Sequence, residues 1–358
     1  MLNSKTEALG IIFPNSYDAM VPELASERLM ASIPFASRYR MCDFILSSMV
    51  HSGIDNISII VRKNYHSLLD HLGAGREWDL VRKNGGLNIV PPFAQKQVKV
   101  FEGRIEALES LRGYLLKQPQ KYVIMTDANI AINFDFNELL DAHIKSGADV
   151  TMMYRKQEIP KAFIRQSRDR MDLYYALGMN GDRVSKIYIN PTEEGEMNFS
   201  MNIYVVEREF LINMIDDAYV HGHTYFVRDL LDKQIDRLDI RGFCYDGYVV
   251  NIHDTQSYFE ENMRLLQEEN LNALFSPNQI YTKIRDDNPT RYVAGSSVKN
   301  SLLADGCVIE GTVENCVLFR GCQVKKGAVV KNCVLMQDTV VETDCGVEYV
   351  VTDKNVHI

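Results

Sequence analysis

The sequence predicts an α/β unit with a doubly wound, mostly parallel sheet, followed by a parallel β-helix. Three observations lead to this fold class. The 358 residues are about two to three times the usual domain size. Short apolar runs rich in β-branched residues alternate with helical patterns up to about residue 275. From residue 294 onward, short aliphatic segments alternate with Gly and Asn at a regular interval.

The first unit carries the strands and helices of such a sheet in alternation. Buried strands are predicted for the short apolar runs at residues 8–13, 57–61, 122–125, 148–154 and 200–206. Amphipathic patterns predict helices over residues 43–52 and 105–117, and one long helix over residues 254–274. Strands separated by helices are typical of parallel sheets with helices on both faces.

The character of the sequence changes after residue 275. Ser276-Pro277 is followed by a polar stretch that ends in Asn288-Pro289, which is typical of a connecting segment. We therefore predict a first domain over residues 1–275, a linker over residues 276–293 and a second domain over residues 294–358.

The second domain repeats itself every 15 to 17 residues, with sub-repeats of five or six. Residues 314–318 (ENCVL) return as residues 331–335 (KNCVL), and similar Gly-containing segments lie between them. This degenerate hexapeptide repeat is typical of a β-helix whose coils each hold three short strands. The alternative is a β-sandwich with accidental similarity, and the doubled NCVL segment favours the β-helix.

The seven cysteines do not form a disulfide framework, and five of them lie between residues 307 and 345. Cys316 and Cys333 occupy equivalent repeat positions, as do Cys307 and Cys322. We expect these thiols to point inward as small apolar residues. The spacing lacks the C-x-x-C pattern of a metal site, and free thiols fit a reducing compartment.

Composition limits the partners of the chain. It is 46% hydrophobic and 24% charged with a net charge of −9, which is typical of a globular protein. The acidic balance argues against a nucleic-acid surface and a polybasic membrane anchor, but it permits a local basic pocket for a phosphorylated metabolite. The sequence shows no secretion signal and no membrane span, so we predict a cytoplasmic protein.

Two positions are candidates for ligand chemistry. The turn after the first strand holds Asn15, Ser16 and Asp18, and glycine is absent between residues 11 and 51. Such a turn is a poor cradle for phosphate, because the backbone cannot approach the anion closely. Asp127 follows the strand at residues 122–125, at the edge where α/β sheets bind ligands. Its position fits an Mg²⁺ ligand and a turn aspartate equally well.

Blocks along nearly the whole chain resemble the ADP-glucose pyrophosphorylases (glucose-1-phosphate adenylyltransferases). They include Pro34-Phe35, Asp43-Phe44, His71-Leu72, Trp78-Asp79-Leu80 and Ser257-Tyr258-Phe259. The resemblance implies a nucleotidyltransferase-like, Rossmann-related first domain and a left-handed β-helix. It also implies the joining of ATP and glucose 1-phosphate into ADP-glucose for glycogen or starch. That reaction depends on cations, backbone donors and Mg²⁺ rather than on a protein nucleophile.

Most positions that the resemblance implies for catalysis carry other residue types here. The family's glycine loop falls on Asn15, Ser16 and Asp18, its loop arginine on Met20, and its phosphate-contacting lysine on Met30. Each lost electrostatic donor costs roughly 10²–10³ in rate. We therefore expect these replacements to leave the chain with little catalytic activity.

The remaining positions are mixed. The lysine that holds the sugar phosphate falls on Asn190 and the second metal aspartate on Tyr225, while Asp127 matches the first metal aspartate. Gly103 and Arg104 resemble part of the family's substrate-proximal block. The candidate nucleotide and sugar-phosphate positions are thus Asn15, Ser16, Gly103 and Arg104, and the candidate metal ligand is Asp127.

These losses resemble a regulatory or structural companion subunit of this family. The expected partner is a catalytic subunit in a heterotetramer, with self-association and a small phosphorylated metabolite as further possibilities. The alternative is a weakly active glucose-1-phosphate adenylyltransferase that holds Mg²⁺ on Asp127 and uses Arg104 or Arg28 as cations. A hexapeptide acyltransferase is disfavoured, because such enzymes use a catalytic histidine and His357 is the only one after residue 253.

Overall fold

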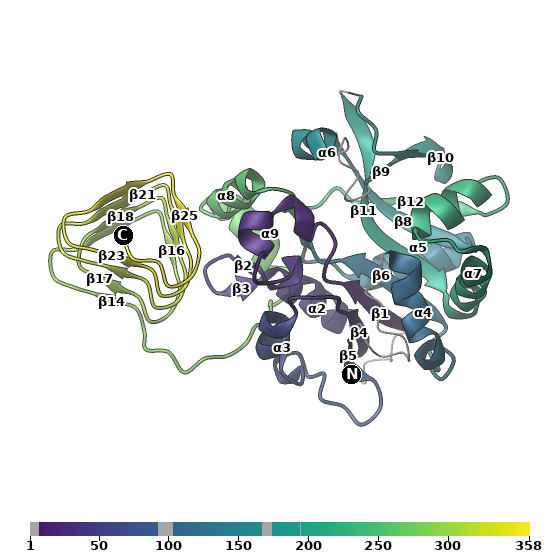
Figure 1. The fold of residues 1–358 in the computed structure, drawn as a ribbon, viewed down its shortest axis with the longest axis horizontal. Helices are drawn as coiled ribbons and strands as arrows, with labels where there is room; N and C mark the ends of the chain where they lie inside the picture. Colours follow the sequence, from purple (N-terminus) through teal and green to yellow (C-terminus); the bar gives the residue numbers. More distant parts are fainter. Residues whose placement is uncertain (1–6, 92–102, 167–173, 194) are drawn as a thin grey trace.

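The structure is a computed structural model that describes residues 7–91, 103–166, 174–193 and 195–358. A sheet-based domain and a β-helix lie side by side along the long axis of the molecule (Figure 1). The predicted fold class, an α/β domain followed by a parallel β-helix, is confirmed. Among the described residues, every helix is too short or too polar to cross a lipid bilayer.

The first domain is built on one nine-stranded sheet in the order β5-β4-β1-β6-β11-β8-β12-β10-β9. From one edge to the other, the strands are β5 (Gly86–Val90), β4 (Asn56–Ile60), β1 (Ala8–Phe13), β6 (Tyr122–Asp127), β11 (Glu196–Glu207), β8 (Val150–Glu158), β12 (Ile240–Cys244), β10 (Arg183–Ile189) and β9 (Tyr175–Asn180). The four predicted strands at residues 57–61, 122–125, 148–154 and 200–206 correspond to β4, β6, β8 and β11 with shifted ends, and 8–13 is β1.

The sheet is mixed, with fewer parallel pairs than expected. The strands β5, β4, β1 and β6 pair in parallel, as do β8 and β12. The pairs β6–β11, β11–β8, β12–β10 and β10–β9 are antiparallel. One cause is local: a tight turn at Gly181, whose φ is +63°, joins β9 to β10, and such a turn can only connect antiparallel strands.

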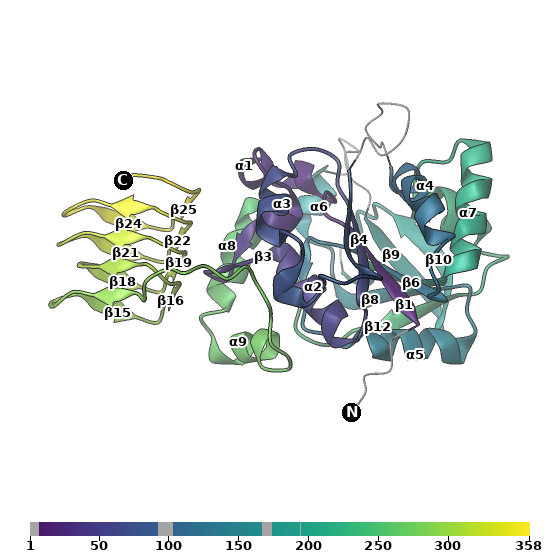
Figure 2. The same cartoon turned by 90° about the horizontal axis from the view of Figure 1, so that it is seen from below.

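Helices cover both faces of the sheet, as predicted (Figures 1 and 2). The larger ones are α2 (Met41–His51), α3 (His66–Leu72), α4 (Arg104–Leu115), α5 (Phe136–Ser146) and α7 (Arg208–His221). Residues of β1 alternate between the two apolar cores. Leu9 and Ile11 join the core that contains Leu108 of α4, and Ile12 joins the core that contains Leu46 of α2.

The single long helix predicted over residues 254–274 is wrong, because the structure has two helices there. They are α8 (Thr255–Arg264) and α9 (Glu268–Phe275). Gln267 adopts an extended conformation at the break. The carbonyl of Arg264 accepts from the side-chain amide of Asn270 at 3.0 Å and from the backbone amide of Gln267 at 3.2 Å, so it is satisfied at the end of α8 without a continuing helix.

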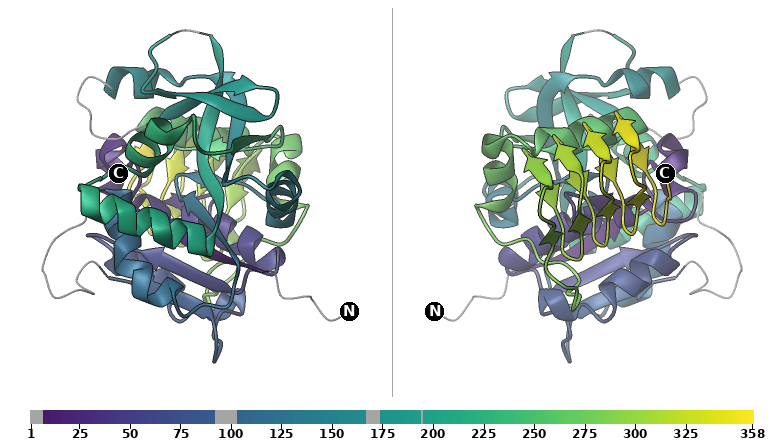
Figure 3. Two further views of the ribbon diagram at one scale, coloured as in Figure 1. Left: turned by 90° about the vertical axis from the view of Figure 1, so that its right-hand side faces the viewer. Right: turned by 90° about the vertical axis from the view of Figure 1, so that its left-hand side faces the viewer.

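The second domain is a left-handed parallel β-helix made of three four-stranded parallel sheets (Figure 3, right). The first sheet contains β14 (Arg291–Tyr292), β17 (Val308–Ile309), β20 (Gln323–Val324) and β23 (Val340–Val341). The second contains β15 (Ser297–Lys299), β18 (Thr312–Glu314), β21 (Val329–Lys331) and β24 (Gly346–Glu348). The third contains β16 (Leu302–Leu303), β19 (Val317–Leu318), β22 (Val334–Leu335) and β25 (Val351–Thr352).

The repeated cysteines point into this β-helix, which confirms their predicted role. Cys307, Cys316, Cys322 and Cys333 are fully buried and are free thiols. The Sγ of Cys316 donates to the carbonyl two residues before it at 3.1 Å, and that of Cys333 does the same at 2.9 Å. The sequence repeat is thus also a repeat of side-chain contacts in successive coils.

The two domains share an apolar core. Phe319 and Met336 of the β-helix belong to the same buried cluster as Tyr258 of α8 and Leu274 of α9. Figure 2 shows α8 and α9 between the coils and the large sheet. This packing fixes the β-helix against the first domain and leaves a pocket along the junction.

Candidate functional site

A cleft of about 810 Å³ opens where several strands of the large sheet end. Phe13 is the last residue of β1, Ile60 of β4 and Asp127 of β6, and all three line the cleft. The start of α4 closes one side. This is the edge at which α/β sheets bind their ligands. The cleft brings together six of the candidate positions, namely Asn15, Ser16, Gly103, Arg104, Asp127 and Tyr225.

Asp127 is engaged by two groups of the protein itself. The guanidinium of Arg104 lies 2.5 Å from its Oδ1, and the hydroxyl of Ser16 donates to the same oxygen at 2.7 Å. The Asp127 side chain is 1% exposed and that of Arg104 is 16% exposed. The other carboxylate oxygen, Oδ2, is buried and accepts no hydrogen bond from the described residues. The charge of this carboxylate is therefore balanced from within the chain.

Arg104 is held firmly in this position. Its guanidinium carbon lies 4.6 Å from the ring centre of Phe13 and 5.4 Å from that of Tyr204, which are cation–π distances. Burial alone would lower the pKa of Arg104, but the neighbouring Asp127 carboxylate raises it above its usual value. Arg104 is thus a permanent cation whose charge is directed at Asp127.

Gly103 allows α4 to begin against a neighbouring loop. A Cβ atom at Gly103 would lie 2.3 Å from the carbonyl oxygen of Thr224, so only glycine fits. The amide of Ile105 donates to the same carbonyl at 3.3 Å. The ring of Tyr225 follows directly and lies 4.0 Å from the guanidinium carbon of Arg228. The position that the resemblance assigns to a metal carboxylate is occupied by this cation–π pair.

The loop after β1 is closed by its own side chains. Asp18 accepts a hydrogen bond from the amide of Met30 at 2.7 Å and another from the Asn15 side chain at 2.9 Å. Burial raises the pKa of Asp18 to about 6, although both hydrogen bonds lower it. Asn15 in turn accepts from the amide of Arg62 at 3.0 Å. A carboxylate and a side-chain amide thus fill the place of a glycine-rich anion cradle.

Three of the positions carried over from the resemblance lie elsewhere. Met20 and Met30 are buried in the apolar core around α8. Asn190 lies beyond the end of β10, with φ +49°, and its side chain accepts from the amide of Tyr174 at 2.9 Å. Arg28, a cation in the alternative enzyme, contacts both carboxylate oxygens of Asp353 in the β-helix at 2.7 and 2.9 Å. It contributes no charge to the cleft.

The residues present in the cleft do not fit the Mg²⁺ ion that the resemblance implies. Among the described residues, the cleft offers one carboxylate, Asp127, and an arginine already lies against it. The second carboxylate position is Tyr225. Magnesium prefers several oxygen ligands and retains bound water, whereas a buried guanidinium at this distance repels a second cation.

Sequence reasoning missed several residues of the cleft. The hydroxyl of Tyr17 accepts from the Asn202 side chain at 2.7 Å, and the hydroxyl of Tyr204 donates to the same side chain at 2.7 Å. Arg62 and Tyr175 also line the cleft. The left-handed conformations of Tyr17 and Asn202 mark irregular backbone beside a site, but their torsion angles are not visible in a sequence.

A second pocket, of about 700 Å³, lies at the junction of the two domains and is strongly basic. Its cationic residues come from the first domain, the connecting segment and the β-helix, and they are Arg38, Arg40, Lys283, Arg285, Arg320 and Lys354. The acidic residues that line it are Asp70 and Asp338. Six cations against two carboxylates make this junction pocket an anion-binding candidate.

Two of these cations are poorly compensated. Arg320 is 7% exposed, and its Nε makes no hydrogen bond with the described residues and lies 3.7 Å from the carboxylate of Asp287. Burial, together with the neighbouring cations Arg40 and Arg28, lowers the pKa of Lys354 to about 8. A bound anion would stabilise the charged forms of both side chains by offsetting the positive charge around them.

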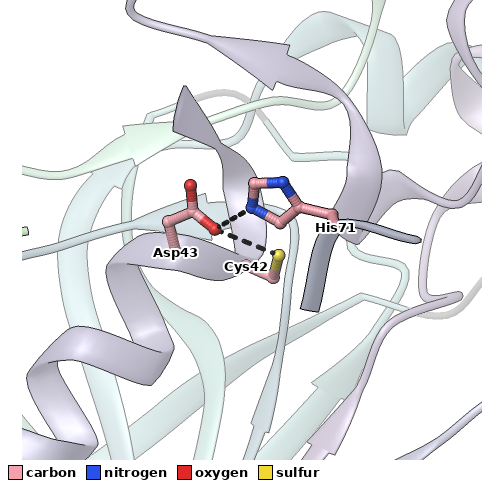
Figure 4. Close-up of side chains that lie close together, drawn as sticks. All are labelled: Cys42, Asp43 and His71. Atoms are coloured by element: carbon pink, nitrogen blue, oxygen red, sulfur yellow. Dashed lines mark hydrogen bonds and ion pairs between the residues drawn. The ribbon is translucent and has the colours of Figure 1, made fainter. Parts of the chain in front are cut away.

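The wall of the junction pocket includes His71, which belongs to a buried cluster with Cys42 and Asp43 (Figure 4). The ring Nε2 of His71 lies 2.6 Å from Asp43 Oδ1, and the Cys42 thiol donates to the same oxygen at 3.5 Å. The other Asp43 oxygen accepts from the amide of Arg40 at 2.9 Å. These hydrogen bonds account for the cluster, and the cations beside it disfavour a metal ion.

Comparison with known proteins gives consistent results for both domains. Residues 23–268 match a family described as nucleotidyl transferase, and residues 284–358 match one described as GlmU-like, C-terminal hexapeptide. The glycogen biosynthesis protein GlgD of Bacillus subtilis (strain 168) is 33% identical over 356 residues, which cover 98% of this chain and 91% of that protein. GlgD of Geobacillus stearothermophilus is 35% identical over 324 residues, or 90% of this chain and 82% of that protein.

Glucose-1-phosphate adenylyltransferases are also similar. The enzyme of Geobacillus stearothermophilus is 29% identical over 336 residues, which cover 91% of this chain and 84% of that enzyme. The similarity to both groups extends through both domains.

Proposed function

This chain belongs to the glucose-1-phosphate adenylyltransferase family as a GlgD-like member, and we propose that it is a regulatory or structural subunit in glycogen biosynthesis. In this proposal it joins a catalytic subunit in a heterotetramer that makes ADP-glucose in the cytoplasm. Its own contribution to ADP-glucose formation from ATP and glucose 1-phosphate is small. Self-association into homo-oligomers is a further part of the proposal.

The observation that carries the proposal is the internal pairing of Arg104 with Asp127. Phosphoryl transfer needs uncompensated positive charge directed at the phosphates. In the cleft, the retained carboxylate and its nearest cation neutralise each other. Met20 and Met30, at positions where the resemblance implies cations, are apolar and lie in the core. Each such loss costs roughly 10²–10³ in rate, so the isolated chain should turn over very slowly.

The junction pocket supports the regulatory part of the proposal. Its cations come from both domains, so an anion bound there contacts both at once. A phosphorylated metabolite has the charge and the acceptor oxygens that arginine and lysine side chains recognise. If it binds one arrangement of the domains better than another, it shifts the equilibrium between them and thereby changes the activity of the partner.

The test is to measure pyrophosphate release by the catalytic subunit alone, by this chain alone, and by the mixture. We expect co-purification in one complex and a change in the apparent affinity for substrate, or in the response to phosphorylated effectors, when this chain is present. The variant Arg320→Gln should form the complex but weaken the effector response. Unchanged kinetics on mixing, at concentrations where a complex is detected, would refute the regulatory role.

A weakly active enzyme is the second candidate, because Asp127 still lies in the cleft at the end of β6. In that case the chain alone should release pyrophosphate from ATP and glucose 1-phosphate, and Asp127→Asn should abolish the signal. A slow rate that survives Asp127→Asn would come from a contaminating enzyme, which removes the support for this candidate.

A further inference from the structure

Side chains from three separate segments meet at one carboxylate oxygen in the cleft. Ser16 comes from the loop after β1, Arg104 from the first turn of α4 and Asp127 from the end of β6. A divalent cation bound to Asp127 would occupy the same region. Here that region contains a guanidinium group, and the Ser16 hydroxyl completes the contacts of Oδ1.

The position of Arg104 is built into the fold rather than adopted by a loose side chain. The residue begins α4, and Gly103 before it lets the helix start against the carbonyl of Thr224. The guanidinium then lies over the rings of Phe13 and Tyr204. For the group to swing away, it would have to leave both rings and abandon its only close carboxylate among the described residues.

We infer that Arg104 is a built-in cation that replaces a divalent metal ion at Asp127. The inference deepens the proposed function, because it rests on that proposal for the identity of the cleft. As a consequence, the cleft excludes Mg²⁺ and Mn²⁺, and any ligand that enters binds to the protein without one. Removing the guanidinium while keeping Asp127 should uncover a carboxylate that binds a divalent cation.

The geometry favours exclusion over sharing. Asp127 is 1% exposed, so a metal ion at its free Oδ2 would have to lose most of its water. It would also lie within a few ångströms of Arg104, where two positive charges repel strongly in a medium of low polarity. The cleft offers no second carboxylate to compensate, because Asp127 is the only acidic residue in its lining among the described residues.

The experiment is to titrate the full-length protein with Mn²⁺ and to follow the free ion by electron paramagnetic resonance. The variants are Arg104→Met, which removes the charge and keeps the length, and Arg104→Gln, which keeps a hydrogen-bond donor for Asp127. Arg104→Met combined with Asp127→Asn is the matched control. Arg104→Lys retains a positive charge and is a second control.

We expect no site-specific Mn²⁺ binding by the wild type or by Arg104→Lys. Arg104→Met or Arg104→Gln should bind one Mn²⁺ at least tenfold more tightly than the wild type, and the added Asp127→Asn should abolish that binding. Circular dichroism identifies which single variants fold, and either one suffices. Wild-type binding of Mn²⁺ that Asp127→Asn removes would overturn the inference, as would folded Arg104 variants that bind no Mn²⁺.

These outcomes are independent of the test of the proposed function. A chain that excludes Mn²⁺ through Arg104 but leaves its catalytic partner unchanged would retain the inference and lose the regulatory role. A chain that alters its partner while binding Mn²⁺ at Asp127 would do the reverse.

Discussion

Replacing Asp127 by Asn should destabilise the first domain through the charge that it leaves behind. The substitution is nearly isosteric, so the packing around residue 127 is retained. Arg104, with a side chain that is 16% exposed, would lose its counter-charge and stay surrounded by Phe13 and Tyr204. The expected effect is therefore electrostatic and should depend on whether Arg104 is present.

The magnitude follows from the burial of the pair. Breaking a buried ion pair from one side costs about 3–5 kcal/mol, because the remaining charge is uncompensated. The amide oxygen of Asn still accepts a hydrogen bond, so we expect about 3 kcal/mol for Asp127→Asn. Arg104→Met should cost a similar amount at neutral pH. The double variant should cost less than the sum, which gives a coupling of at least about 2 kcal/mol.

The assay is urea unfolding followed by the fluorescence of Trp78, which is the only tryptophan and is fully buried in the first domain. Asp182→Asn is the matched control, because Asp182 lies 2.7 Å from Arg241 in a pair with side chains 69% and 29% exposed. Such a pair should contribute less than about 1 kcal/mol. If Asp127→Asn and Asp182→Asn cost the same, the argument for a strong internal pair is refuted.

Three further predictions concern α4 and the junction pocket. Gly103→Ala should cost about 1–3 kcal/mol in urea unfolding, because its Cβ would meet the Thr224 carbonyl, whereas Gly113→Ala in the same helix should gain about 0.5–1 kcal/mol. Equal effects would contradict the close approach. The pKa of Lys354 is lowered from 10.5 to about 8 in the folded state, so between pH 8 and 10.5 the unfolded state binds more protons. The free energy of unfolding should therefore increase by about 1 kcal/mol across this range after solvent screening. Lys354→Met should flatten the dependence of the free energy of unfolding on pH. Phosphate at 20 mM should raise the melting temperature of the wild type by a few degrees, about 2–4 °C per kcal/mol of binding. Arg320→Gln should remove this shift. An equal shift in both proteins would argue against phosphate binding in the junction pocket.

The elements that sequence analysis predicted well are those determined by local patterns. The strand β1 is an uninterrupted apolar run, and its residues alternate between two cores as period-two geometry requires. The β-helix followed from a repeat visible in the letters. The break between α8 and α9 was not predicted, because the apolar periodicity continues through it and one side chain, Asn270, caps the first helix.

The cleft was predicted in part. Its position followed from the rule that ligands bind where parallel strands end, and six candidate positions do meet there. The pairing of Arg104 with Asp127 did not follow, since the two are 23 residues apart and the contact depends on how α4 packs beside β6. The sequence suggests Arg104 as a cation available to a substrate, whereas the fold directs it to a carboxylate.

The junction pocket was invisible in the sequence for a different reason. A net charge of −9 conceals a local excess of cations, because the six residues come from segments up to about 300 positions apart. Composition allowed such a pocket without indicating where it lies. Only the docking of the β-helix on the first domain brings Arg38 and Arg40 beside Arg320 and Lys354.

The distribution of charge between the two pockets is consistent with the proposed function, in which a subunit with little activity of its own influences a catalytic partner. In the cleft, Arg104 and Asp127 cancel, so substrate phosphates gain little by binding there. In the junction pocket, the carboxylates that the described residues place near Arg320 and Lys354 do not fully offset the burial of these cations. We therefore expect an anion to bind this arrangement of the domains more tightly than any arrangement that separates them, and such a difference in affinity would couple ligand binding to conformation.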